Sequence, residues 1–145
     1  MNGKPLSGTS QAEQAVLEAA ATCVAAFGSH DTPGYFACFA PTATFLFHQT
    51  DRLLGSREEY EAEWASWESD GFRVLSCASS EQRVDVLGDG TVGTVAVFTH
   101  RVLTTVRAAA DEAPQGQRER ETIVFRRQAD GRWLGVHEHL SPEPG

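Results

Sequence analysis

The last strand pair of the chain, residues 118–141, restricts the possible folds more than any other stretch. A charged and β-branched run reaches Asp130-Gly131, and the chain returns as a second run that begins with Arg132-Trp133 and contains His-x-His. An Asp-Gly pair suits a tight hairpin because glycine adopts positive φ without steric cost. We therefore predict that an antiparallel hairpin closes the fold.

The whole second half of the chain is rich in β-forming residues. Four runs, at 72–87, 91–107, 117–128 and 132–140, are separated by short connections or by one polar loop. Short connections between consecutive strands favour an antiparallel meander. Each run is longer than the usual strand of about five or six residues, so we expect bends or bulges.

The first half of the chain alternates helical patterns with a single strand. Capping boxes begin two of the helices, and an apolar stripe of small side chains follows the first. The predicted elements are a helix at 11–27, a short helix between Asp31 and Pro41, a strand at 43–48, and a helix between Ser56 and Asp70.

Helices followed by long antiparallel strands predict an α+β fold in which three N-terminal helices pack on one face of a curved antiparallel sheet. Such a sheet, covered on one side, forms a cone whose mouth is a natural pocket. A chain of 145 residues is long enough for one core. We expect a single domain at 10–141, a flexible arm at 1–9 and a tail at 142–145.

Charge and cysteine usage limit the partners and the compartment. Twelve basic and twenty acidic residues give a net charge of −8, which disfavours nucleic acid and anionic membranes as partners. No apolar run approaches the roughly 20 residues of a membrane span, and no secretory signal is visible. Cys23, Cys38 and Cys77 show no metal-binding spacing and suit reduced thiols in a cytoplasm.

Three stretches resemble the nuclear transport factor 2-like superfamily, and its SnoaL-like members most closely. They are YFACFAPTATF at 35–45, LGSREEY at 54–60 and GRWLGVHEHLS at 131–141. The third is similar to the closing strand of the association domain of calcium/calmodulin-dependent kinase II. The resemblance implies a cystatin-like cone and a homodimer through the outer sheet face. It also implies functions that range from isomerases, dehydratases and polyketide cyclases to binding modules.

The resemblance also implies positions for site residues. In the ketosteroid isomerase branch a carboxylate near the end of the first strand is the general base, and Phe47 falls at that position with His48 next to it. A phenylalanine cannot take a proton, whereas His48 could do so after a shift of one residue. Arg101 matches one arginine of the association-domain branch, and a second family arginine falls at Ile123.

His137 and His139 alternate with Trp133 and Gly135, which predicts one shared strand face. If that face is concave, two imidazoles enter the pocket and can act as acid and base. The alternative is a pair of hydrogen-bonded structural histidines.

Arg101 stands alone on an apolar strand face and Glu121 shares a face with apolar neighbours. Arg101 would clamp a ligand anion, or pair internally with Glu121 or Glu81. Glu121 would be a buried partner of a histidine or of Arg101, or part of a salt bridge at the rim. A metal site would need His48, His100 or Glu121 beside the two histidines, and we predict no metal and no cofactor.

Aromatic residues recur on the elements that surround the predicted cone, either as core or as the wall of an apolar pocket. The preferred hypothesis is a pocket that binds a small, partly apolar molecule, with cofactor-independent isomerase or lyase chemistry if it is an enzyme. The alternative is a non-catalytic ligand-binding or association module. The candidate catalytic residues are His139, His137, His48 and Arg101. The candidate substrate-binding residues are Tyr35, Phe39, Phe47, Tyr60, Trp64, Trp67, Arg101, Glu121 and Trp133.

Overall fold

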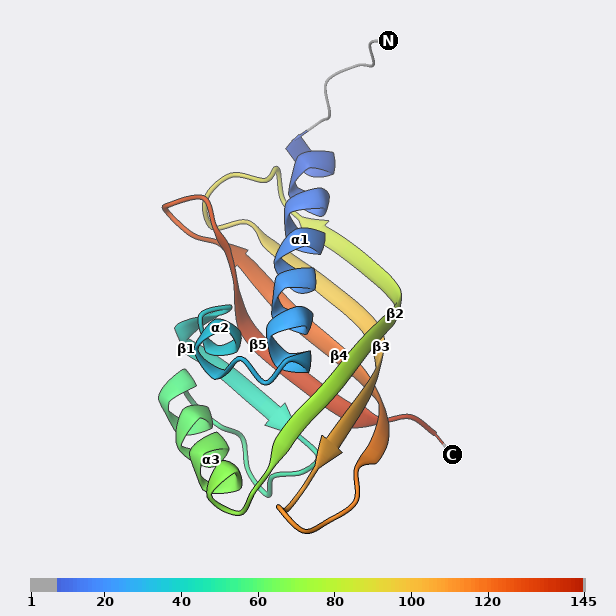
Figure 1. Ribbon diagram of the computed structural model, residues 1–145. Helices are drawn as coiled ribbons and strands as arrows, with labels where there is room; N and C mark the ends of the chain where they lie inside the picture. The colour runs from blue at the N-terminus through green and yellow to red at the C-terminus, as the bar shows by residue number, and fades with distance from the viewer. Residues whose placement is uncertain (1–7, 145) are drawn as a thin grey trace.

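The computed structural model of the protein describes residues 8–144 and has the expected element order (Figure 1). The elements are α1 (Gly8–Gly28), α2 (Thr32–Phe36), β1 (Phe39–Phe47), α3 (Arg57–Ser69), β2 (Arg73–Leu87), β3 (Val95–Arg107), β4 (Gln115–Arg127) and β5 (Trp133–Pro142). The first helix therefore begins at Gly8 rather than at 11. Residues 1–7 of the expected arm lie outside the described residues. No helix within 8–144 is long and apolar enough to span a membrane.

The strands form one five-stranded sheet in the order β1-β5-β4-β3-β2. The meander of β2 to β5 is antiparallel throughout, which confirms the predicted hairpin at the end of the chain. Gly131 has φ +90° in its turn, as the Asp-Gly pair requires. β1 departs from the antiparallel expectation because it joins the edge of the sheet parallel to β5.

Local capping follows the sequence. The Asp31 side chain accepts a hydrogen bond from the Gly34 N–H at 3.2 Å and begins α2. The Ser56 hydroxyl accepts a hydrogen bond from the Glu59 N–H at 3.1 Å and begins α3. These side chains satisfy backbone donors that a helix leaves unpaired in its first turn.

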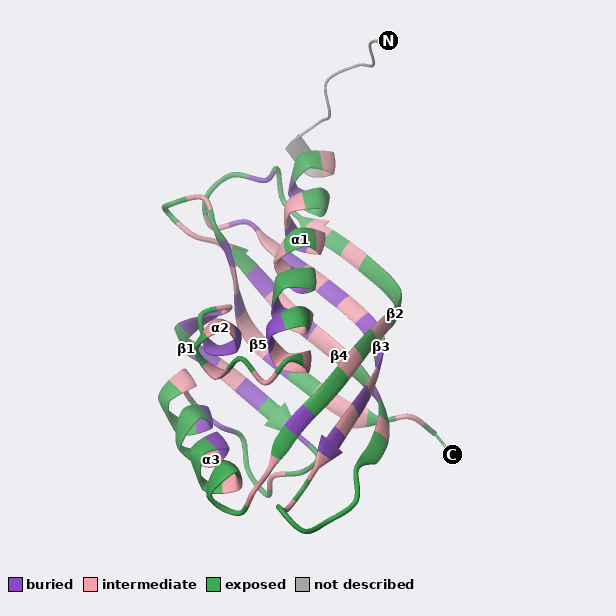
Figure 2. Ribbon diagram, in the orientation of Figure 1, coloured by how far each residue is buried: buried purple, intermediate pink, exposed green. Residues whose placement is uncertain are grey.

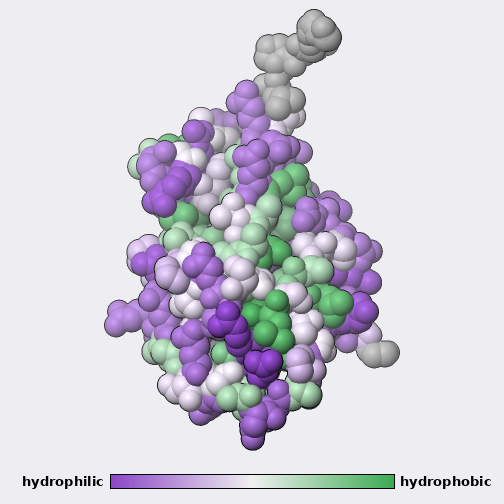
Figure 3. Space-filling view, viewed as in Figure 1, coloured by the Kyte–Doolittle hydropathy of each residue, from purple (hydrophilic) through white to green (hydrophobic). Residues whose placement is uncertain are grey.

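The three helices cover one face of the twisted sheet, and α1 crosses it along its length (Figure 1). Buried positions on the strands alternate with more exposed ones, as in a sheet with one covered face (Figure 2). α1 lies close to β2 at its C-terminal end, where a Cβ on Gly28 would come within 3.0 Å of the Cys77 backbone nitrogen. On this side of the molecule, apolar surface appears between hydrophilic areas (Figure 3).

A β-bulge interrupts the closing strand. Phe125 of β4 pairs with Gly135, but the preceding residue, Val124, pairs with His137, so Val136 is an extra residue on β5. A bulge of this kind changes which face the following side chains occupy. β2 also carries two register shifts against β3, as the length of the predicted strands suggested.

The bulge corrects the expectation that His137 and His139 share a concave face with Trp133. Trp133 is buried, but after the bulge Glu138 takes the inner face and is only 4% exposed. His139 is exposed, and His137 forms a hydrogen bond with the Thr44 hydroxyl on β1 at 2.7 Å. The two histidines therefore lie on the outer face of the sheet, and Glu138 lies between them on the inner face.

Candidate functional site

A cavity of about 250 Å³ lies between the concave sheet face and the three helices. Most of its surface comes from aromatic and aliphatic side chains, and its polar side chains are concentrated on β4 and β5. Seven aromatic residues line it: Phe27, Tyr35, Phe47, Tyr60, Trp64, Trp67 and Phe72. The acidic residues of the lining are Asp70, Glu119, Glu121 and Glu138.

The aromatic wall is assembled from α1, α2, α3 and β1. The Tyr60 ring packs against Phe47 with centroids 4.9 Å apart and against Trp67 at 6.3 Å. The ring centroids of Trp64 and Tyr35 lie 5.5 Å apart. Tilted and edge-to-face rings at these separations are the arrangement that aromatic quadrupoles favour. The helices therefore hold the wall in a fixed shape.

Five aromatic residues proposed from the sequence line the cavity, namely Tyr35, Phe47, Tyr60, Trp64 and Trp67. Phe39 and Trp133 are buried in the core, and neither is among the described residues that line the cavity. The Phe39 ring lies over Gly135, where an added Cβ would come within 2.6 Å of Phe39 Cδ1.

Two carboxyl groups, Glu121 and Glu138, face the interior of the cavity. The Tyr35 hydroxyl donates a hydrogen bond to Glu138 Oε1 at 3.1 Å, and it lies 3.0 Å from the Tyr60 hydroxyl. Burial raises the pKa of Glu138 well above its usual range, and the charge and hydrogen bonding of Glu121 raise it further. Burial is also the main reason that the pKa of Glu121 is raised.

Two nearby carboxyl groups that both resist ionisation titrate as a unit and retain one proton over a range of pH. Burial raises the pKa of both groups, but Glu121 Oε1 also lies 2.6 Å from the ring nitrogen Nε2 of His100, a contact that favours its ionised form, so we assign the shared proton to Glu138. The cavity then holds a carboxylic acid beside a carboxylate, which are the two partners needed for general acid–base chemistry.

A buried histidine, His100, supports the carboxylate from behind. Its Nε2 lies 2.6 Å from Glu121 Oε1 and its Nδ1 lies 2.6 Å from the Ser79 hydroxyl. Burial lowers the pKa of His100 to about 4, so the ring is neutral at pH 7. The contacts then fit one tautomer, in which Nε2–H donates to Glu121 and Nδ1 accepts from Ser79.

From the sequence, His100 was proposed only as a metal ligand, although the alternation of β3 already indicated that its side chain would be buried. His100 lies between Phe98 and Val102 in the alternation of β3, and all three are buried. Arg101 has the opposite parity and therefore lies on the other face.

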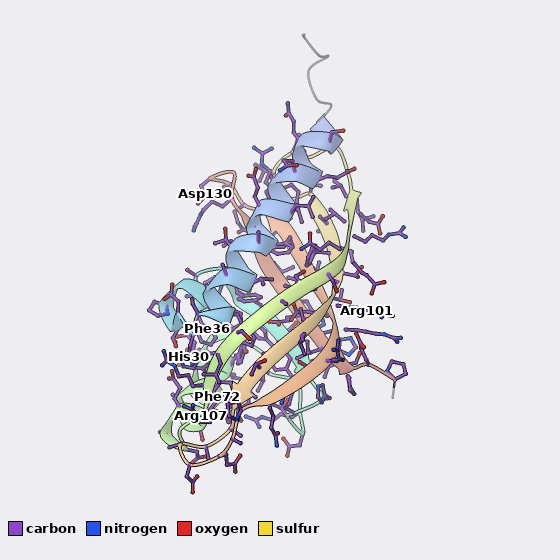
Figure 4. All side chains as sticks on the ribbon, turned by 45° about the vertical axis from the view of Figure 1, so that its right-hand side comes forward. His30, Phe36, Phe72, Arg101, Arg107 and Asp130 are labelled. Carbon is purple, nitrogen blue, oxygen red and sulfur yellow. The ribbon has the colours of Figure 1, made fainter. Side chains whose placement is uncertain are left out.

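Arg101 lies outside the cavity, on the side of the sheet away from the helices (Figure 4). Its side chain is 49% exposed and its Nε lies 2.7 Å from Glu81 and 3.7 Å from Glu143. This is the internal pair with Glu81 that was the alternative to an anion clamp. Glu121 pairs with His100 instead, so the expected contact between Arg101 and Glu121 is corrected.

Glu119 lies further along β4 than Glu121 and is 3% exposed. Its Oε2 lies 2.5 Å from His48 Nε2, and the Gln49 side-chain amide donates to it at 2.9 Å. The His48 side chain is 37% exposed, so this cluster joins the cavity to the surface. Within residues 8–144, no group of three histidine, cysteine or acidic side chains is arranged to hold a metal ion.

Comparison with known proteins identifies relatives by family and by fold. The model of the SnoaL-like domain family matches residues 16–144. A search of curated proteins gives no match. Among solved structures, a ketosteroid isomerase-like protein from Erwinia carotovora atroseptica superposes with a TM-score of 0.75 at 16% identity, covering 91% of this chain and 96% of its own.

Two further structures share the fold at low identity. A protein from Xanthomonas campestris, provisionally named as a calcium/calmodulin dependent protein kinase II association domain, superposes with a TM-score of 0.64 at 19% identity. It covers 99% of this chain and 94% of its own. A provisionally named dehydratase of the NTF2-like family from Streptomyces avermitilis gives 0.67 at 19% identity, with coverage of 93% and 99%. At identities this low, the superpositions show the shared fold alone.

Proposed function

The chain belongs to the SnoaL-like domain family of the nuclear transport factor 2-like superfamily, and on that premise we propose that its cavity catalyses proton transfer on a small, partly apolar organic molecule without a cofactor. The reaction class is isomerisation, dehydration or cyclisation. The observation that carries the proposal is the Glu121–Glu138 carboxyl pair inside an aromatic-walled cavity. A ketosteroid isomerase-like protein and a provisionally named dehydratase with the same fold support this class.

Each carboxyl group has a distinct role in the proposed reaction. Protonated Glu138 donates its proton to a carbonyl oxygen of the substrate, while ionised Glu121 removes a proton from the carbon next to that carbonyl. The product of this step is an enol. When the substrate has a carbon–carbon double bond next to the deprotonated carbon, this enol is a dienol. In a second step Glu138 takes back the hydroxyl proton and Glu121 returns its proton to the far end of the dienol, which completes an isomerisation with both carboxyl groups restored.

The surrounding residues set up this division of roles. Tyr35 holds Glu138 through the hydrogen bond to Oε1, and His100 holds Glu121 through Nε2. Phe47, which the family alignment places at the base position, lines the cavity without a group that can move a proton. The carboxyl groups of β4 and β5 take over that role in our proposal.

The test uses small cyclic ketones, namely cyclohexanone, 3-cyclohexen-1-one and 1-tetralone, in D₂O, with deuterium incorporation beside the carbonyl followed by NMR. We expect Glu138→Gln and Glu121→Gln each to slow incorporation by roughly 10²–10⁴-fold relative to the native chain. His139→Ala, on the outer sheet face, should retain the native rate. The proposal fails if both glutamine variants exchange a bound ketone as fast as the native protein.

A non-catalytic ligand-binding module is the second candidate. The observation that favours it is that the carboxyl groups already have partners within the fold, in Tyr35 and His100. In that case the glutamine variants would change ligand affinity and stability, and the native protein would not deuterate a ketone that it binds.

A homodimer through the outer sheet face remains part of the proposal. That face carries half-buried apolar side chains, including Val97, Leu103 and Val124, among polar ones. Size-exclusion chromatography with light scattering tests it, since a dimer should persist as the protein is diluted. A monomeric mass across a wide range of concentrations would reject it.

A further inference from the structure

The charged side chains of the cavity all have the same sign. Asp70, Glu119, Glu121 and Glu138 line it, and the described lining residues include no lysine, arginine or histidine. A carboxylate or phosphate on a ligand would lose its hydration here and meet only negative or neutral groups, which is strongly unfavourable. The cavity therefore selects against anionic ligands.

The buried carboxyl pair lacks a cationic partner within the part of the chain that the structure describes. Buried carboxylates in proteins are normally paired with a cation or coordinate a metal. Here Glu138 contacts Tyr35, and Glu121 contacts the neutral ring of His100. Arg101, on β3, forms an ion pair with Glu81 on the other face of the sheet. The ionised member of the pair, Glu121, thus has no cation beside it among the described residues.

The aromatic wall also favours a positively charged ligand. The ring centroids of Trp64 and Phe72 lie 5.3 Å apart, and those of Trp67 and Phe72 lie 5.7 Å apart. These rings line the same cavity as the acidic residues. The face of an aromatic ring carries negative electrostatic potential and attracts organic cations, most strongly when the cation has been desolvated. Aromatic rings and carboxylates around one cavity act together on an ammonium group.

We propose that the natural ligand of this cavity is an organic cation: an ammonium group carried on a compact apolar body that the aromatic wall encloses. This inference rests on the proposed function of the cavity as a small-molecule site and narrows its substrate class. The ammonium group would donate its N–H bonds to the carboxylate side of the cavity. Its charge would also keep Glu121 ionised and therefore available as the base.

The test compares probes that differ only in charge. Cyclohexylmethylamine, cyclohexylmethanol and cyclohexanecarboxylate share one body, and the amine, alcohol and carboxylate of adamantane share a larger one. Binding at neutral pH is measured by calorimetry and by the fluorescence of Trp64 and Trp67, which line the cavity. We expect the amine to bind at least tenfold more tightly than the alcohol of the same body, and the carboxylate to bind most weakly.

Variants assign that preference to the cavity. Glu121→Gln combined with Glu138→Gln should reduce the difference between amine and alcohol to less than threefold, whereas Glu13→Gln, on the exposed side of α1, should leave it unchanged. The inference is overturned if the alcohol or the carboxylate binds as tightly as the amine. It is also overturned if neither amine binds to a protein that still deuterates a cyclic ketone. Both results leave the proposed proton transfer standing, which has its own test.

Discussion

Replacing Glu138 by glutamine should change how the stability of the protein depends on pH. The substitution keeps the size of the side chain and imitates the protonated carboxyl group, including its ability to accept the hydrogen bond from Tyr35. It removes the proton that the native carboxyl pair would have to lose at high pH. The free energy of unfolding of the two proteins should therefore diverge as the pH rises.

The sign and the slope follow from proton linkage. The pKa of Glu138 in the folded protein lies well above the ordinary value of 4.5. Between these two values the folded chain holds a proton that the unfolded chain has released. The native free energy of unfolding then falls by about 1.4 kcal/mol per pH unit. The glutamine variant has no such loss, so its stability relative to the native chain should rise at that slope and level off above the folded pKa of Glu138.

His100 contributes in the opposite direction. Its pKa falls from 6.5 to about 4 on folding, so the unfolded chain takes up a proton in this window and the folded chain does not. Stability from this group is lost as the pH falls from 6.5 towards 4. Because both proteins contain His100, its contribution largely cancels in the difference between them.

Urea unfolding at a series of pH values from about 5 to about 8.5 measures the difference, with the midpoint and the slope of each curve fitted separately. Glu13→Gln serves as the matched control because it removes one exposed carboxyl group of α1 and reports the effect of changing the net charge. A constant difference between Glu138→Gln and the native protein over this range would refute the burial of a protonated carboxyl group.

Two further predictions concern the core and the thiols. Gly135→Ala should lower the free energy of unfolding by about 1–3 kcal/mol, because the new Cβ would come within 2.6 Å of the Phe39 ring. Urea unfolding measures the loss, and Gly116→Ala is the control because the nearest atom to its added Cβ is 3.6 Å away. Equal losses in the two variants would contradict the close packing of Phe39 on Gly135. Iodoacetamide at about pH 8 should label Cys38 before Cys23. A hydrogen bond from Cys23 lowers the pKa of Cys38, whereas the same contact and burial raise the pKa of Cys23. Peptide mass spectrometry gives the order of labelling, and earlier labelling of Cys23 would contradict the prediction.

The position of the bulge has a consequence for the site. If β5 alternated strictly from Trp133 without a bulge, His137 and His139 would lie on the inner face and Glu138 on the outer face. The bulge instead brings the Glu138 carboxyl group to the inner face, which the helices cover. Bulges occur often next to active sites because they re-aim individual side chains.

The local signals in the sequence were sufficient for the element order and the fold class, but not for the parallel pairing of β1 with β5. Capping residues such as Asp31 and Ser56, the Asp-Gly turn and the long β-rich runs depend on short-range chemistry, and they predicted the element order and the α+β fold that the structure has. The sequence also proposed Tyr35 of α2 and the aromatic residues of α3 as core or pocket residues, because helical spacing directs the latter to one side.

The tertiary structure decided which polar residues enter the cavity. The side chains of a strand change face with each residue, so one bulged position reverses the assignment of all that follow. The bulge at Val136 belongs to the pairing of β5 with β4, beside the close packing of Phe39 on Gly135, and these contacts are distant in sequence. Sequence alone therefore predicted that the closing strand would line a pocket, and only the folded chain determined that Glu138 faces it.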